Sequence, residues 1–239
     1  MTKKRIFEFG GYAAAVILVA FGIATLVMGL NGRSTVNSSL KQEQIVGTPD
    51  MTPKAIAGEV AAARGAQGKL VSSLQKAGVN ITPTSIDNPS CSVANKQIDS
   101  GDRARCFAKY MRIHTFAATS GLTYSQMGRY VAQPNAPLKF TDGLGATNDP
   151  TKAVTDPKTQ QPVANGRRDI WVTYTALTTA LNTSYMADQL SLFAVVIGIA
   201  LLLAGVGFGI LAFATFRIPA IITKTRATEA PVPSGVQPA

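Results

Sequence analysis

Few residues of this 239-residue chain could do chemistry, and they begin with a single histidine, His114. A catalytic base normally works with a nucleophile and an orienting carboxylate, and a non-haem iron site typically uses two histidines and a carboxylate. No second histidine can partner His114, and a satisfied or surface histidine is the alternative interpretation. The sequence therefore predicts a protein that is not an enzyme, with no catalytic residue, no metal ligand and no cofactor.

The two cysteines, Cys91 and Cys106, form the second candidate group. Their spacing is far from C-x-x-C, and two thiolates with His114 would still need a carboxylate to complete a four-ligand metal site. A bridge between them would close a loop of about 15 residues, which stabilises a fold by roughly 3 kcal/mol in the chain-entropy model. We predict a disulfide.

A basic cluster lies in the stretch "DRARCFAKYMR", where cationic side chains alternate with Phe107 and Tyr110. Its four cations are Arg103, Arg105, Lys109 and Arg112. Such a cluster could contact an anionic surface, either lipid headgroups or acidic wall polymers. The alternative is an ordinary solvated helix face, since charge runs of this kind are common.

The acidic residues offer weaker signals. Asp99 and Asp102 are explained by a turn and a helix N-cap. Asp142, Asp149 and Asp156 recur every seven residues, but the D-x-[DN]-x-[DN]-G core of a calcium loop is absent, so we expect turn-forming aspartates.

Two uncharged runs, Gly10 to Leu30 and Leu192 to Phe216, are each long enough to cross a bilayer as a helix. The first run follows "MTKKR" and could also begin a secretory signal. It is longer than a typical signal core, however, and lacks an A-x-A cleavage pattern. We therefore expect two membrane anchors.

Lys and Arg next to the spans predict the orientation. Three precede the first span and three follow the second, and such charges are enriched on the cytoplasmic side. The expected division is a cytoplasmic N-terminus (1–9), a first transmembrane helix (10–30), an extracytoplasmic domain (31–190), a second transmembrane helix (191–216) and a short cytoplasmic tail (217–239). The expected location is the plasma membrane, and nucleic acid is not an expected partner.

Helical patterns dominate the segment between the spans. The stretch "IVGTPDMTP" reads as a helix stop at Gly47 followed by a start with Thr52 as N-cap. We expect helices from Pro53 to Ala77, from Asp102 to about Thr119, and from Ile170 directly into the second span. Residues 132–166 are irregular and are the best candidate surface for a partner. The predicted fold is a mainly α membrane protein, with two transmembrane helices bracketing a largely helical domain that has minor β structure.

Small residues predict helix packing in the spans. Gly205 and Gly209 form a small-xxx-small pattern that permits close helix contact. The partner could be Ala20 and Ala24 of the first span, another copy of the chain, or another protein.

The stretches "NGRSTV", "LKQEQIVGTPDMTP" and "DIWVTYTALTTALNTSYMA", followed by a Gly-rich span, resemble a family of two-span actinobacterial membrane proteins of unassigned function. Some members carry an aromatic ring-opening dioxygenase label, and a chain with one histidine disagrees with that chemistry. The resemblance implies topology and lineage only.

Together these features predict a non-enzymatic envelope membrane protein that binds a partner or serves as an accessory subunit, with itself or other membrane proteins as partners. The alternative is an extracytoplasmic protein that binds or senses a ligand or a cell-wall polymer.

Overall fold

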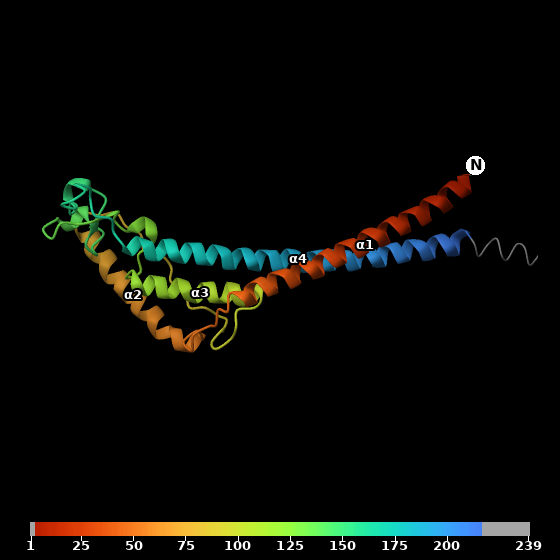
Figure 1. The fold of residues 1–239 in the computed structure, drawn as a ribbon, viewed down its shortest axis with the longest axis horizontal. Coiled ribbons are helices and arrows are strands. Elements are labelled where there is room, and N and C mark those ends of the chain that lie inside the picture. The colour runs from red at the N-terminus through yellow and green to blue at the C-terminus, as the bar shows by residue number, and fades with distance from the viewer. Residues whose placement is uncertain (1–2, 217–239) are drawn as a thin grey trace, which may run out of the picture. The chain divides into compact units, whose positions relative to one another are not determined.

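The computed structural model describes residues 3–216 and is mainly helical (Figure 1). Its elements are α1 (Lys3–Gln42), α2 (Pro53–Lys76), α3 (Gly101–Ala118), β1 (Tyr130–Val131), β2 (Ala146–Thr147) and α4 (Arg167–Phe216), with three short 3-10 turns between α3 and α4. The chain divides into a terminal unit, residues 1–34 and 190–239, and a central unit, residues 35–189. Both α1 and α4 contribute to each unit. The four long helices and two short strands of the described residues confirm the prediction of a mainly helical chain with minor strand content.

The described part of the terminal unit contains the apolar ends of α1 and α4, which run antiparallel. Both helices are long and apolar enough to cross a membrane, over Phe9–Gln42 and Arg167–Ala214. Their backbones approach closely at several glycines, among them Gly22 and Gly198: a Cβ on Gly22 would lie 3.0 Å from the carbonyl oxygen of Gly198, and a Cβ on Gly198 would lie 2.7 Å from the backbone nitrogen of Leu26. Neither residue has a side chain to hold the helices apart.

Gly205 and Gly209, the two glycines predicted to pack against another helix, also contact α1, but not at Ala20 and Ala24. A Cβ on Gly205 would come within 2.7 Å of the Val19 side chain, and one on Gly209 would touch Ala15 at an ordinary 3.8 Å. The expected partners Ala20 and Ala24 are exposed. Of the three partners left open by the sequence, the face of α4 with Gly205 and Gly209 contacts α1, at Ala15 and Val19.

The junction after α1 differs from prediction in one detail. Gln44 adopts the left-handed conformation with φ of 52°, and Gly47 does not. Gly47 instead forms a β-bridge with Ala94, and an added Cβ would overlap the carbonyl of Val93. Glycine is required at position 47 because another strand segment lies against its backbone.

Helix α2 begins as predicted. The Thr52 side chain accepts a hydrogen bond from the Ala55 amide at 3.1 Å, and Pro53 occupies the first turn. Three of its glycines, Gly58, Gly65 and Gly68, are exposed, and nothing lies within 4 Å of an added Cβ. The helix packs through its opposite face.

Helix α3 lies beside α2 and supplies much of the core of the central unit (Figure 1). Its fully buried side chains include Tyr110, Ile113 and Phe116, whereas Ala117 is exposed. Its N-cap is Ser100, so the predicted N-cap role of Asp102 is wrong. Asp102 lies in the first helical turn, where a negative charge suits the helix dipole.

The predicted disulfide is confirmed: Cys91 is bonded to Cys106 of α3, with Cα atoms 6.1 Å apart. Next to it, the Tyr110 hydroxyl donates a hydrogen bond to the Cys91 carbonyl. Burial, and secondarily the Asp50 carboxylate, raise the pKa of Tyr110, which favours the neutral donor. The bridge and this hydrogen bond fix the segment before α3 onto the helix.

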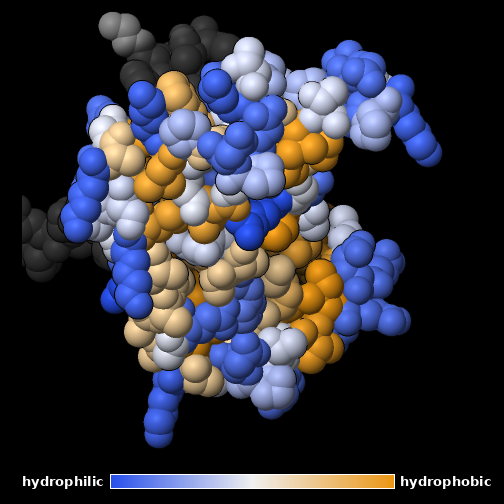
Figure 2. Space-filling view, turned by 90° about the vertical axis from the view of Figure 1, so that its left-hand side faces the viewer, coloured by the Kyte–Doolittle hydropathy of each residue, from blue (hydrophilic) through white to orange (hydrophobic). Residues whose placement is uncertain are grey.

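Residues 120–166 form a looped region around the antiparallel pair β1–β2, in which Tyr130 pairs with Thr147 and Val131 with Ala146. Its aspartates stabilise turns, as predicted. Asp142 accepts hydrogen bonds from the backbone amides of Gly128, Leu144 and Ala146. Figure 2 shows this end of the central unit, where apolar and hydrophilic residues are interleaved.

The first half of α4 closes the core. Trp171, the only tryptophan in the chain, is buried, and its indole N–H donates to the Leu122 carbonyl at 2.9 Å. Its ring makes edge-to-face contacts with Phe116 at 5.3 Å and Tyr174 at 5.2 Å between ring centroids. These contacts fix α4 against α3.

A basic groove as the candidate functional site

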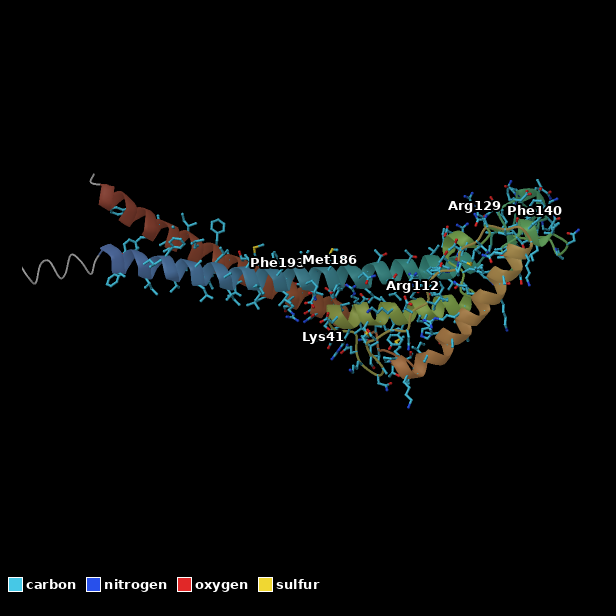
Figure 3. All side chains as sticks on the ribbon, turned by 180° about the vertical axis from the view of Figure 1, so that it is seen from behind. Lys41, Arg112, Arg129, Phe140, Met186 and Phe193 are labelled. Atoms are coloured by element: carbon cyan, nitrogen blue, oxygen red, sulfur yellow. A yellow bond between two sulfur atoms is a disulfide. The ribbon has the colours of Figure 1, made fainter. Side chains whose placement is uncertain are left out.

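Three cations of the predicted cluster line one groove between α3 and α4. Arg105, Lys109 and Arg112 follow one another at spacings of four and three, which places them on one helix face. The facing wall comes from α4, and the groove has a volume of about 520 Å³. Figure 3 labels Arg112 of α3 and Met186 of α4, which mark its two sides.

Aromatic rings position the guanidinium groups of the groove. The Arg105 guanidinium lies 4.5 Å from the centroid of the Tyr185 ring. That of Arg112 lies 5.0 Å from the Phe116 ring and 6.0 Å from the Trp171 ring. Stacking of this kind holds an arginine in one orientation while its N–H donors remain open to a ligand.

No carboxylate lines the groove in the part of the chain that the structure describes. Its lining residues are Arg105, Ala108, Lys109, Arg112, Tyr174, Asn182, Tyr185, Met186 and Gln189. The three cations are therefore not neutralised by an acidic wall, and the amides of Asn182 and Gln189 add neutral donors and acceptors. This combination suits an anion with several oxygen atoms, such as a phosphate group.

A second hollow extends the basic surface. It has a volume of about 500 Å³ and is formed by residues 84–90 together with Lys109, Arg112, Ile113 and Phe116. Its wall carries the hydroxyls of Thr84, Ser85 and Ser90, the amide of Asn88 and also the carboxylate of Asp87, so this hollow, unlike the groove, is lined by charges of both signs. Because Lys109 and Arg112 line both hollows, a ligand longer than one phosphate group could contact both.

The fourth predicted cation, Arg103, lies outside the groove. Its guanidinium donates to Asp99 at 2.6 Å and to the Gln97 carbonyl at 3.2 Å. The acid that the sequence analysis assigned to a turn is therefore an ion-pair partner. The structure brings three of the four predicted cations together and separates the fourth.

The α4 side of the groove escaped the sequence analysis. Tyr174, Asn182, Tyr185 and Gln189 recur at helical spacing on one face, but the same pattern predicts any amphipathic helix. What distinguishes these residues is their place opposite the cations of α3. That depends on the close approach of the two helices at Gly101, where an added Cβ would lie 2.9 Å from the Tyr185 Cα.

A comparison of the chain with protein-family models, curated proteins and solved structures found no match. The resemblance to a two-span actinobacterial family stays a prediction, and the function is argued from the site alone.

Proposed function

We propose that the chain is a non-enzymatic membrane protein of the cell envelope whose extracytoplasmic domain binds a phosphate-bearing envelope molecule in the basic groove. The observation that carries this proposal is the set of Arg105, Lys109 and Arg112 around a groove without a carboxylate. Hydrogen bonds to charged groups contribute about 1.5–3 kcal/mol each, so three cations can give specific binding. The proposal develops the ligand-binding alternative of the sequence analysis.

The proposed orientation has both termini in the cytoplasm and residues 31–190 outside. The Lys and Arg residues that flank the two apolar runs support it. The last lining residue of the groove, Gln189, precedes the uncharged run at Leu192 by only three positions of a continuous helix. At about 1.5 Å per residue this is a short distance from a membrane surface that presents phosphate groups.

The test is binding of phosphate-bearing probes to the full chain in nanodiscs. We expect saturable, salt-sensitive binding of a soluble glycerol-phosphate oligomer by calorimetry, in discs of zwitterionic lipid. Anionic-lipid discs provide the second arm: if lipid phosphate is the natural ligand, those discs should abolish binding of the soluble probe by competition. If the oligomer binds equally in both discs, the natural ligand is a soluble or polymeric phosphate.

Variants connect the binding to the groove. Replacing both Arg105 and Arg112 with Gln should weaken binding by at least about tenfold, since 1.4 kcal/mol is a factor of ten. Arg103→Gln removes one positive charge from the same helix outside the groove, so it is the matched control for each of the single variants Arg105→Gln and Arg112→Gln. Equal losses in the control and the single variants would overturn the assignment and leave only a general effect of net charge.

A second candidate function is docking of a protein partner on the looped region, which would make the chain an accessory subunit. Leu138 and Phe140 are each 41% exposed there, and Figure 3 labels Phe140. Isolated exposed side chains are common, so the basic groove remains the better-supported site. Co-purification of a stoichiometric partner that is lost in Phe140→Ser would favour this second function.

A further inference from the structure

Three potential metal-ligating side chains meet on the other side of α3 from the basic groove. Asp50 comes from the loop before α2, Glu59 from α2 and His114 from α3. The His114 Nδ1 lies 2.9 Å from a Glu59 oxygen, and its Nε2 lies 3.4 Å from an Asp50 oxygen. The ligand atoms all lie within 4.8 Å of one another.

The fold fixes each of these residues. The Asp50 carbonyl accepts the Thr52 amide at 2.8 Å, and Met51 is held on both sides by backbone hydrogen bonds to Thr48 and Val93. Glu59 lies beside Val60, which is buried in the core that α2 shares with α3. His114 follows the fully buried Ile113. The cluster is therefore set by the packing of the central unit and not by a chance meeting of mobile side chains.

With its proton on Nδ1, the imidazole of His114 has no hydrogen atom to donate from Nε2 to the Asp50 carboxylate. An ionised carboxylate only accepts hydrogen bonds, so the Nδ1 of His114 must donate to Glu59. In the neutral imidazole the Nε2 then carries a lone pair, which faces the Asp50 carboxylate oxygen at 3.4 Å. Two acceptors that face each other need a cation between them, either a proton or a metal ion.

The local charge also favours a cation. Within the described residues, no Lys or Arg forms a salt bridge with Asp50 or Glu59. All three side chains are partly open, with exposed fractions of 43% for Asp50, 31% for Glu59 and 30% for His114. A dissolved ion can therefore reach the pair of carboxylates directly.

We propose that His114 Nε2 and the Asp50 carboxylate bind a divalent transition-metal ion of the zinc type, with Glu59 holding the imidazole through Nδ1. A metal with bonds of about 2.1 Å and tetrahedral angles separates its ligand atoms by about 3.4 Å, and the nitrogen-to-oxygen distance here is 3.4 Å. A carboxylate on the second ring nitrogen is the usual outer-shell partner of a metal-bound histidine.

Water completes the proposed coordination. His114 lines an open hollow of about 430 Å³ together with Asp169 and Thr173 of α4, which leaves space for solvent beside the ring. The site would link the loop before α2 to α3 and would be independent of the basic groove. A prediction of no metal ligand was reasonable from sequence, because Glu59 and His114 are 55 positions apart.

The experiment is titration of the full chain, purified in detergent with a tag that contains no histidine, with Cu²⁺ as probe and then Zn²⁺ as competitor. His114 is the only histidine and both cysteines are bonded, so nitrogen hyperfine coupling in the Cu²⁺ resonance spectrum can report only on His114 or on backbone and terminal nitrogens. We expect one equivalent to bind with imidazole coupling and Zn²⁺ to displace it.

Variants decide the outcome. His114→Gln and Asp50→Asn should remove the saturable binding, and Glu59→Gln should weaken it about 10- to 100-fold. Asp87→Asn, an exposed acid outside the cluster, should leave it unchanged. An intact disulfide and unchanged circular dichroism would show that each variant is folded. Absence of imidazole coupling in the unmodified chain would overturn the proposal.

Discussion

Single glycines in this protein have opposite effects on the stability of the fold, depending on what surrounds them. Gly65 of α2 lies in open space, whereas Gly101 lies directly against α4. A glycine inside an exposed helix costs about 1 kcal/mol relative to alanine. A glycine at a helix contact instead allows two backbones to approach.

We therefore predict that Gly65→Ala raises the free energy of unfolding by about 1 kcal/mol. Its counterpart Gly101→Ala should lower it by about 1–3 kcal/mol, because the new Cβ would lie 2.7 Å from the Asp188 Cβ and 2.9 Å from the Tyr185 Cα. Thermal unfolding of the detergent-solubilised protein measures both changes. If the two variants shift the midpoint in the same direction, the contact at Gly101 is not as described.

Local rules predict local features well at this scale. Thr52 and Pro53 start α2 as their types require, and the cysteines pair because their segments are close in sequence. The role of Gly47 was missed because its reason is distant: the segment around Ala94 lies on its backbone. No pattern within residues 45–53 encodes that neighbour.

At the scale of secondary-structure elements, the apolar ends of α1 and α4 pack against each other. Their existence follows from composition, but their register depends on which small residues face each other. The small-xxx-small pattern predicted Gly205 and Gly209, whereas the close backbone approaches also involve Gly22, Gly29 and Gly198. Gly22 and Gly29 are seven positions apart, as are Gly198 and Gly205, so a search for small residues four positions apart does not find these pairs.

Gly198→Leu should therefore disrupt the pairing of the two helices, because an added side chain meets the backbone of Leu26. Gly207→Leu is the matched control on the same helix, since nothing lies within 4 Å of its Cβ position. Cysteine cross-linking between Ala15→Cys and Gly209→Cys, whose Cβ positions lie 3.8 Å apart, would measure the loss in native membranes. Equal cross-linking in both leucine variants would contradict the described register.

Across the whole molecule, the candidate sites arise only on folding. The basic groove needs α3 and α4 together, and the His114 cluster combines residues from a loop and two helices. The cations of α3 could be predicted from the sequence because they recur on one helix face. The α4 residues that face them could not, since the distance between two helices is set by core packing and not by residue spacing along the chain.

Orientation is also a property of the whole chain. A fluorescent reporter fused after Ala239 should be active inside the cell, and the Cys91–Cys106 bridge should be fully formed in protein taken from growing cells, because such bridges persist outside the cytoplasm. Alkylation before and after reduction measures the bridge. Free thiols in freshly isolated protein, together with a reporter active only outside, would reverse the proposed topology.

The burial of Trp171 gives this protein an intrinsic optical probe. It is the only tryptophan, its ring is packed between Phe116 and Tyr174, and the Arg112 guanidinium lies 6.0 Å away. Nearly all indole emission of the chain therefore originates beside the basic groove. Tryptophan emission of an unlabelled sample therefore reports on the place where Trp171 of α4 packs against Phe116 of α3, next to Arg112.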